Sequence, residues 1–416
     1  MRRREFVFSS LAALAPRGAR LRISAVEIWK LEGHREAATG VNRQHQVNPL
    51  HVYDELRPKP YRDGKPVARL ASVSALYLKI KTAEGVEGTY GPVDKDAAIV
   101  VDQQLRPFLM GKDALAGEAL WDQMHRSNRH SRRGLFMMGI SAVDNALWDL
   151  RGRYFETPVY RLLGGPTRES VEAYASCLGY SLEPDAMSRR AAALKEEGYR
   201  YQKWFLAYGP GDGPEGLRKN VETVRILREA VGDDVHLMFD AYNGWDLTYA
   251  LEWARQVERW RPHWIEEAFH PEKIESFAAL RRAIGFPVAS GEHLYGRWEV
   301  EQYLNAGALH VVQADPEWCG GASELLKICT VASLHDAQVI PHGHSIHAAL
   351  HVVGSQSPMT CPLAEYLIIK MGSYYHFEKD APRPVRGKLA LPDRPGFGIE
   401  WDPAKVEKQT KVNWAG

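Results

Sequence analysis

The sequence is poor in the features that mark several classes of protein. Four cysteines occur in 416 residues, and no two of them form a Cys-x-x-Cys pair. A disulfide framework and a zinc knuckle are therefore not expected. Lys plus Arg is 53 and Asp plus Glu is 52, so no excess charge indicates a nucleic acid or membrane surface as partner. No apolar run is long enough to span a membrane.

What remains is an ordinary globular composition, 45% hydrophobic and 25% charged, in a chain long enough for a barrel with an added domain. The first residues stand apart. Arg2-Arg3-Arg4-Glu5-Phe6-Val7 precedes a short apolar stretch and Ala13-Leu14-Ala15. This pattern resembles a twin-arginine export signal, which would place the protein in the periplasm. The alternative is a disordered basic tail on a cytoplasmic protein, and Pro16 counts against cleavage.

The first part of the remaining chain has strand patterns and then helix patterns. Residues 23–31 and 73–81 carry β-branched and aromatic residues in partial alternation, and Glu84-Gly85 predicts a hairpin turn. The polar segment 34–70 between them is expected to be a long loop. Residues 95–163 have helical spacing, with one buried stripe over 139–152 and a stop at Leu162-Leu163-Gly164-Gly165-Pro166.

From residue 170 onward, short β-like runs alternate with longer helical patterns such as 217–231 and 323–335. The runs lie near 171–176, 200–206, 235–240, 263–267, 287–291, 309–314, 338–341 and 362–367. Eight strands with alternating helices are typical of a parallel α/β barrel. A doubly wound open sheet is the competing fold, but no Gly-x-Gly-x-x-Gly follows the first of these strands.

In such a barrel the catalytic side chains lie at the carboxyl ends of the strands. The third, fourth and fifth predicted strands each lead to a carboxylate, at Asp240, Glu266 and Glu292. Glu266 follows Asp240 by 26 residues, and Glu292 follows Glu266 by another 26. Three carboxylates at one barrel mouth would repel one another, and a hard divalent cation relieves that repulsion. The trio therefore predicts a Mg²⁺ site.

The remaining strand ends predict acid–base chemistry. Asp315 ends the sixth strand and His342 the seventh, so the carboxylate can orient the imidazole as a general base. Glu365 ends the eighth strand, and Lys203 on the second can point to the mouth as a cation or a base. His342, His344 and His347 also form a histidine-rich run, which occurs in zinc sites, but the carboxylate trio already accounts for a metal.

Longer motifs resemble the enolase superfamily, in its mandelate-racemase-like branch. They are residues 142–149, 162–165, Trp264-Ile265-Glu266-Glu267 and Pro395-Gly396-Phe397-Gly398. The resemblance implies a (β/α)7β TIM-like barrel closed by an α+β capping domain. The expected boundaries are residues 22–165 for the cap, 166–375 for the barrel and 376–416 for a segment completing the cap, with residues 1–21 outside. It also implies Mg²⁺ ligands at Asp240, Glu266 and Glu292, an Asp315–His342 dyad, and stabilisation of the intermediate by Glu365.

Within this branch the chain is most similar to the L-rhamnonate-dehydratase-like acid-sugar dehydratases. Gly209-Pro210-Gly211-Asp212-Gly213, residues 317–321 and residues 364–367 carry this similarity. The implied reaction removes the proton next to the carboxylate of a sugar acid and eliminates the 3-hydroxyl, giving a 2-keto-3-deoxy acid. Phe205 stands where the branch's racemases carry a second lysine. Since dehydration needs one acid–base group and racemisation two, this difference favours a dehydratase.

Two other functions stay open at this stage. A racemase or epimerase of a hydroxy acid could use the same scaffold with Lys203 as second base. A sugar-acid-binding protein without activity would not need an oriented His342. Arg69, His51 and Tyr61 are candidate substrate-binding residues from the segment 34–70. The partners expected are a small sugar acid and further copies of the chain, because relatives form dimers to octamers.

Overall fold

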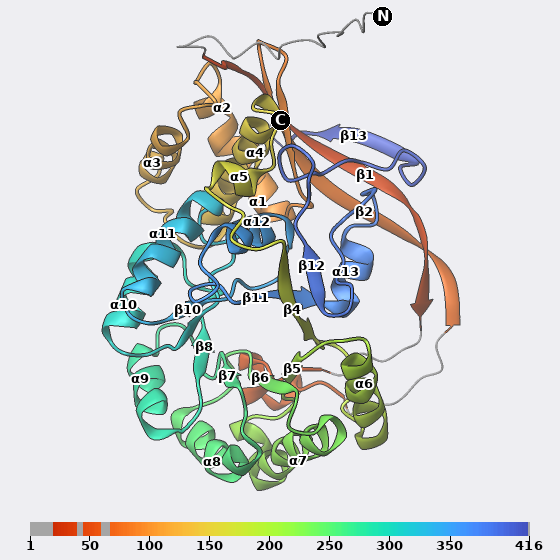
Figure 1. The fold of residues 1–416 in the computed structure, drawn as a ribbon, viewed down its shortest axis with the longest axis vertical. Helices are drawn as coiled ribbons and strands as arrows, with labels where there is room; N and C mark the ends of the chain where they lie inside the picture. The colour runs from red at the N-terminus through yellow and green to blue at the C-terminus, as the bar shows by residue number, and fades with distance from the viewer. Residues whose placement is uncertain (1–19, 40–44, 60–66, 415–416) are drawn as a thin grey trace, which may run out of the picture.

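The structure is a computed structural model that describes residues 20–39, 45–59 and 67–414. The possible export signal at residues 2–15 lies outside the described residues. Two sheets organise the fold, one antiparallel with helices beside it and one parallel and ringed by helices (Figure 1). No helix in the described ranges is long and apolar enough to cross a membrane.

The antiparallel sheet has four strands in the order β13-β1-β2-β3. Their bounds are Lys408–Val412, Ile23–Thr39, Val67–Thr82 and Glu87–Tyr90. Because β13 comes from the last residues of the chain and pairs with β1, both ends of the chain build this sheet. The predicted hairpin turn lies between β2 and β3, where Gly85 has a φ of 86° and so favours a residue without Cβ.

The prediction of one long loop over residues 34–70 is wrong at both ends. β1 continues to Thr39 and pairs with β2 from Val67 onward, with Thr39 opposite Val67 and Arg35 opposite Ala71. Beyond Gly33 this two-stranded ribbon leaves the core, so neither face is fully buried and the apolar alternation that marks a strand disappears. Backbone hydrogen bonds between the two strands hold it, and side-chain patterning does not reveal it.

Helices cover the sheet and join it to the barrel. They are α1 (Lys95–Val100), the π-helical turn η3 (Val101–Leu105), α2 (Arg106–Leu109), α3 (Gly117–Ser127), α4 (Gly134–Tyr154) and α5 (Val159–Leu162). The sequence predicted one buried stripe over residues 139–152, but α4 is buried on most sides. The reason is its central place, with β3 and α1 packed on it as well as α11 of the barrel.

The parallel sheet contains the eight predicted strands in the order β11-β4-β5-β6-β7-β8-β9-β10, with the short β12 (Lys388–Ala390) antiparallel to β4. The strands are β4 (Ser170–Ser176), β5 (Tyr201–Phe205), β6 (His236–Asp240), β7 (Trp264–Glu266), β8 (Val288–Ser290), β9 (Val311–Val312), β10 (Gln338–Val339) and β11 (Leu363–Leu367). The curled sheet confirms the predicted barrel fold.

Helices follow the strands on the outside (Figure 1). They are α6 (Pro184–Glu196), α7 (Gly213–Val231), α8 (Leu247–Val257), α9 (Ile274–Ala283), α10 (Arg297–Asn305), α11 (Ala322–Ser333), α12 (His347–Ser355) and α13 (Ile368–Tyr374). Short 3-10 turns lie at Pro49–Val52 (η1), Asp54–Leu56 (η2), Pro210–Asp212 (η4) and Glu258–Trp260 (η5). Inward-pointing side chains from successive strands, among them Tyr174, Met238 and Trp264, form a separate apolar layer.

Buried polar side chains of α4 fix the helix against the loop after β9. Asn145 donates to the Pro316 carbonyl at 3.0 Å and accepts from the Ala322 amide at 2.9 Å. Asp144 accepts from the Ser323 amide at 2.9 Å. Asn145 and Asp144 thereby satisfy free N–H groups at the start of α11. The conspicuous motif at residues 142–149 thus holds the antiparallel layer to the rim of the barrel.

Candidate functional site

The predicted metal ligands lie at the carboxyl ends of neighbouring strands. Asp240 is the last residue of β6, Glu266 is the last residue of β7, and Glu292 follows β8 by two residues. Their exposed fractions are 8%, 0% and 6%. Parallel register places Asp240 opposite Glu266 across the β6–β7 pair. The strands therefore deliver three buried carboxylates to one side of the barrel, as their spacing predicted.

Lys203 lies among these carboxylates. Its Nζ is 2.5 Å from Glu266 Oε1, 2.8 Å from Glu365 Oε1 and 3.7 Å from Asp240 Oδ2. Burial opposes the charge on Lys203, but Glu266 and Glu365 raise its pKa well above the usual value. Burial likewise disfavours the Glu365 carboxylate, and Lys203 with His342 lowers its pKa to about 2. In this arrangement Lys203 is paired with two carboxylates, whose charges favour its protonated form.

The donor set fits a hard divalent cation. Burial, together with like charges nearby, raises the pKa of Glu266 to about 8 and that of Glu292 to about 8. Burial also raises the pKa of Asp240. The direction of these shifts reflects the cost of ionising neighbouring carboxylates in a buried place. An ion with oxygen preference, such as Mg²⁺, would supply positive charge beyond that of the one lysine, which is shared with Glu365.

Asp315 and His342 come together as predicted. His342 Nδ1 lies 2.7 Å from Asp315 Oδ2, and Asp315 is fully buried. Burial alone would lower the pKa of His342, but Glu292 and Asp315 raise it to about 10. Since Asp315 holds Nδ1, the free nitrogen is Nε2, which lies 3.6 Å from Glu292 Oε2. An imidazole oriented on one nitrogen and open on the other is the arrangement of a general base.

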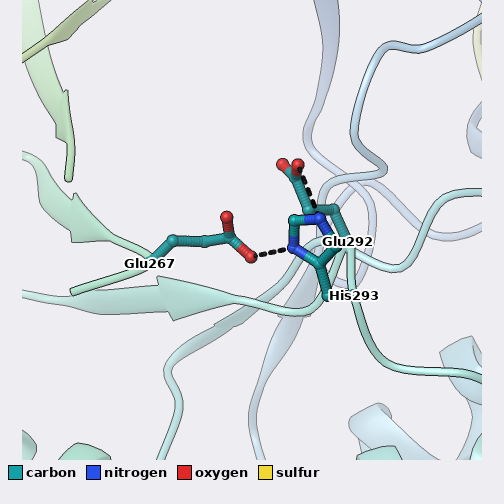
Figure 2. A group of neighbouring side chains, drawn as sticks. All are labelled: Glu267, Glu292 and His293. Carbon is teal, nitrogen blue, oxygen red and sulfur yellow. Dashed lines mark hydrogen bonds and ion pairs between the residues drawn. The ribbon is translucent and has the colours of Figure 1, made fainter. Parts of the chain in front are cut away.

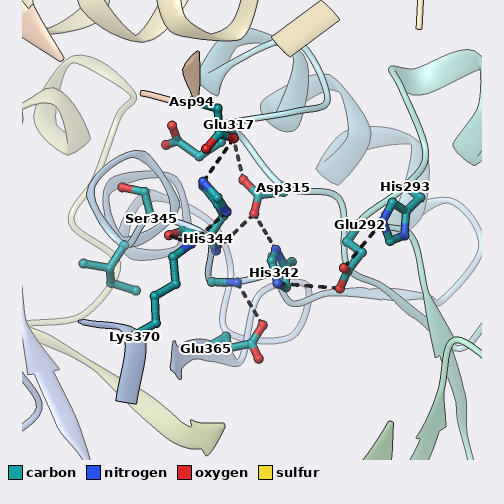
Figure 3. Close-up of polar contacts among 12 residues, drawn as sticks. Asp94, Glu292, His293, Asp315, Glu317, His342, His344, Ser345, Glu365 and Lys370 are labelled. Atoms are coloured by element: carbon teal, nitrogen blue, oxygen red, sulfur yellow. Dashed lines mark hydrogen bonds and ion pairs between the residues drawn. The ribbon is translucent and has the colours of Figure 1, made fainter. Parts of the chain in front are cut away.

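A second layer of polar contacts holds Asp315 (Figure 3). The Glu317 amide donates to its Oδ1 at 2.6 Å, and the His344 amide donates to its Oδ2 at 3.1 Å. Lys370 Nζ lies 2.8 Å from both the Nδ1 and the carbonyl oxygen of His344, whose Nε2 is 3.3 Å from Asp94 Oδ2. Burial lowers the pKa of Lys370 to about 8. The loop that carries the base is thus held from behind by charged groups that the sequence did not indicate.

A second oriented imidazole lies on the other side of Glu292, and the sequence analysis missed it. His293 Nδ1 is 2.8 Å from Glu267 Oε1, and His293 Nε2 is 3.8 Å from Glu292 Oε1 (Figure 2). Burial opposes protonation of His293, but Glu267 raises its pKa to about 9. Among the described residues, Glu267, Glu292 and His293 form a trio whose ligand atoms all lie within 4.8 Å of one another, which the predicted ligands Asp240, Glu266 and Glu292 do not.

Backbone geometry explains why Glu267 was missed. A residue directly after the last inward-pointing residue of a strand normally faces away from the mouth. Glu267 has a φ of 47°, in the left-handed region that few residues other than glycine adopt, and this turns the chain. Tyr242 and Asn243, after β6, have φ of 40° and 58°. Asn243 Nδ2 donates to Glu267 Oε2 at 3.1 Å, so the two unusual turns support each other. No sequence pattern predicts a left-handed glutamate.

Trp318 links the two imidazoles. Its ring lies 4.9 Å from the ring of His342 and 5.9 Å from the ring of His293, with 4.9 Å to His344 as well. Trp318 is partly exposed and follows β9 within the 317–321 motif. The resemblance had singled out this motif without assigning it a role. The structure gives it one, as a flat apolar wall between the two histidines.

The structure gives no substrate contact or zinc-ligand role to the remaining sequence candidates that it describes. His344 pairs with Lys370 and Asp94, and His347 Nε2 pairs with Glu378 at 2.8 Å, so the histidine run does not converge on a zinc ion. Arg69 is exposed in β2, opposite Ala37 in the ribbon. His51 lies in η1, its ring 6.0 Å from that of His45. Tyr61 is outside the described residues.

Comparison with known proteins gives a consistent result. Residues 186–405 match the family described as enolase C-terminal domain-like, and residues 65–164 match the N-terminal domain of the mandelate racemase / muconate lactonizing enzyme family. The L-rhamnonate dehydratase of Saccharopolyspora erythraea is 32% identical over 369 residues, covering 86% of this chain and 90% of that protein.

Two solved structures share the whole architecture. Rhamnonate dehydratase from Gibberella zeae complexed with Mg has a TM-score of 0.77 and 28% identity, over 95% of this chain and 97% of that one. A racemase from Streptomyces coelicolor A3(2) with bound magnesium has a TM-score of 0.75 and 25% identity, over 92% and 98%. Both solved relatives contain magnesium, and they differ in the named reaction.

Proposed function

Because this chain belongs to the enolase superfamily, near its rhamnonate dehydratases, we propose that it is a magnesium-dependent dehydratase of a sugar acid. The chain is a hydro-lyase by this relationship. The observation that carries the proposal for the site is the Asp315–His342 dyad, at 2.7 Å, facing a set of buried carboxylates. A protein that only binds a sugar acid has no need of an imidazole held by a fully buried aspartate.

Asp240, Glu266 and Glu292 would hold the Mg²⁺. When bound, the ion would stabilise the negative charge that develops on the substrate carboxylate as the neighbouring proton leaves. Lys203 contributes a fixed positive charge beside Glu266 and Glu365. Glu365 also accepts a hydrogen bond from the Gly343 amide at 2.8 Å, which fixes the turn that follows the base.

His342 performs the proton transfers in this proposal. Its Nε2 takes the proton from C2 of the sugar acid, while Asp315 stabilises the imidazolium through Nδ1. The same imidazolium then gives the proton to the departing 3-hydroxyl, which leaves as water. The enol that remains tautomerises to a 2-keto-3-deoxy acid, so no proton is gained or lost overall. One oriented imidazole suffices if the proton and the hydroxyl leave from the same face.

Racemisation or epimerisation of a hydroxy acid is the second candidate, favoured by the magnesium-bound racemase among the similar structures. It requires a second base on the opposite face of the planar intermediate. Lys203 is held as a cation between two carboxylates, which supports the dehydratase instead. His293, held by Glu267, is the other group that can exchange a proton.

A screen of sugar acids decides between these functions. Purified enzyme is incubated with each acid and Mg²⁺, and keto-acid product is detected as its semicarbazone. Dehydration predicts the product with at least one acid and its loss after exhaustive chelation. Full activity after chelation would contradict the metal assignment, and stereochemical inversion without keto acid would establish the racemase. His293→Asn tests the proposal that His342 alone performs both proton transfers. If this variant still exchanges the C2 proton but no longer dehydrates the substrate, that proposal fails.

A further inference from the structure

The segment of residues 45–57, here called the strap, lies on the barrel beside the proposed metal ligands. The Val47 amide donates to the Leu206 carbonyl just after β5, at 2.8 Å. Gln46 Nε2 lies 3.5 Å from the carbonyl oxygen of Asp240. The strap thus brings a side chain from outside the barrel to one of the predicted ligands.

Val47 is held in a notch that two glycines create. It is 1% exposed, and a Cβ built on Gly244 would lie 2.7 Å from its Cγ2 and 3.1 Å from its Cγ1. A Cβ on Gly209 would lie 2.9 Å from the same Cγ2 and 2.9 Å from the Gly244 carbonyl oxygen. Neither glycine has a φ in the left-handed region. Space therefore requires glycine at both positions, and Val47 is the nearest side chain to each, beside the Gly244 carbonyl oxygen at Gly209 and the Ala241 carbonyl oxygen at Gly244.

The other end of the strap has its own glycine contact. Arg57 Nη2 donates to the Gly211 carbonyl at 2.6 Å, and Arg57 Nε donates to the His51 carbonyl at 3.0 Å. A Cβ on Gly211 would collide with the Arg57 guanidinium. The segment Gly209-Pro210-Gly211-Asp212-Gly213 thus has a physical role that its sequence does not state, since two of its glycines receive the strap.

We propose that Val47 is a positioning residue: seated between Gly209 and Gly244, it fixes the strap so that Gln46, which lies beside Asp240, contacts the substrate. The identity of the substrate rests on the proposed function. The position of Val47 between Gly209 and Gly244, here called the seat, rests on geometry alone. Val47 touches no reacting atom. Val47 acts through Gln46, whose contact with the substrate would be the same in the ground state and in the transition state. Losing such a contact changes KM more than kcat.

A double-mutant cycle tests the seat. Gly244→Ala places a methyl group where Val47 now lies, and Val47→Ala removes the two methyl groups that it would meet. In the enzyme with Val47 we expect Gly244→Ala to raise KM about tenfold with kcat little changed. In the enzyme with Val47→Ala the same change should have little further effect, because the methyl fills vacated space. Gly372→Ala, where a Cβ meets nothing within 4 Å, is the matched control.

Hydrogen exchange gives a readout that needs no substrate. The Val47 amide is protected by its bond to Leu206, so Gly244→Ala should speed its exchange at least about tenfold, and Gly372→Ala should not. Gln46→Leu should raise KM while leaving that exchange rate unchanged. An equal effect of Gly244→Ala in both backgrounds, or an unchanged Val47 amide, would overturn the proposal. If no sugar acid is turned over, the proposed function fails. The exchange rates then still show whether the contact between Val47 and Gly244 holds the strap.

Discussion

Replacing Asp315 by Asn changes the base without removing it, and the structure sets the size of the effect. The variant loses one charge in a fully buried place, where Oδ2 lies 2.7 Å from His342 Nδ1. A hydrogen bond to a charged group contributes about 1.5–3 kcal/mol. Since each 1.36 kcal/mol corresponds to tenfold in rate, kcat should fall roughly 10- to 150-fold. An amide can also donate its N–H₂ toward Nδ1, which would favour the wrong tautomer.

The pH dependence gives the sharper test of the same variant. Glu292 and Asp315 raise the pKa of His342 against the opposing effect of burial. A base is active only when unprotonated, so activity rises with pH as the imidazole loses its proton. Removing the Asp315 charge lowers the pKa, and the acidic limb of the kcat profile should move to lower pH. Asp94→Asn makes the same chemical change beside His344 and should move it much less. An acidic limb that stays in place, or moves to higher pH, would refute the reasoning.

Three further predictions follow from other parts of the structure. Glu292→Gln removes one buried charge of the proposed metal site and should reduce activity at least about 10³-fold while weakening Mg²⁺ binding in titration calorimetry, with the circular dichroism unchanged. Lys203→Met leaves Glu266 and Glu365 without their cation and should lower the free energy of unfolding of the magnesium-free protein by about 3 kcal/mol or more in urea titrations. Lys203→Arg should lower it less. The effect of Lys203→Met on turnover should be smaller than that of His342→Asn. A reporter fused after residue 25 should reach the periplasm. The double change Arg3→Lys, Arg4→Lys should keep the reporter in the cytoplasm. A native fusion that stays in the cytoplasm would exclude export.

The barrel and its strand ends were predictable because their signal is local. Each parallel strand is a short apolar run, and Asp240 and Glu266 end theirs, so both follow from counting along the chain. Asp315 was expected to end its strand but lies three residues beyond β9, because β9 ends at Val312. The outer ribbon of β1 and β2 was not predictable in the same way. Its pairing depends on backbone hydrogen bonds outside the core, where side-chain alternation carries no information.

The rest of the site depends on contacts between distant segments. Glu267 faces His293 only because its backbone is left-handed, and Lys370 reaches His344 only because α13 packs behind the loop after β10. The candidates Arg69 and His51 were chosen from a polar segment, and polarity does not say which residue of a segment touches the barrel. Val47, an apolar residue in that segment, is buried against the barrel, and Gln46 and Arg57 contact it on either side.

The most direct test of the central claim follows the C2 proton in heavy water. The native enzyme with Mg²⁺ and a sugar acid from the screen is monitored by NMR beside the His342→Asn variant. The native enzyme should form a 2-keto-3-deoxy acid carrying deuterium at C3. His342→Asn should lose both this product and any exchange at C2, by at least ~10²-fold. A His342→Asn enzyme that still exchanges the C2 proton at near the native rate would place the base elsewhere and contradict the account.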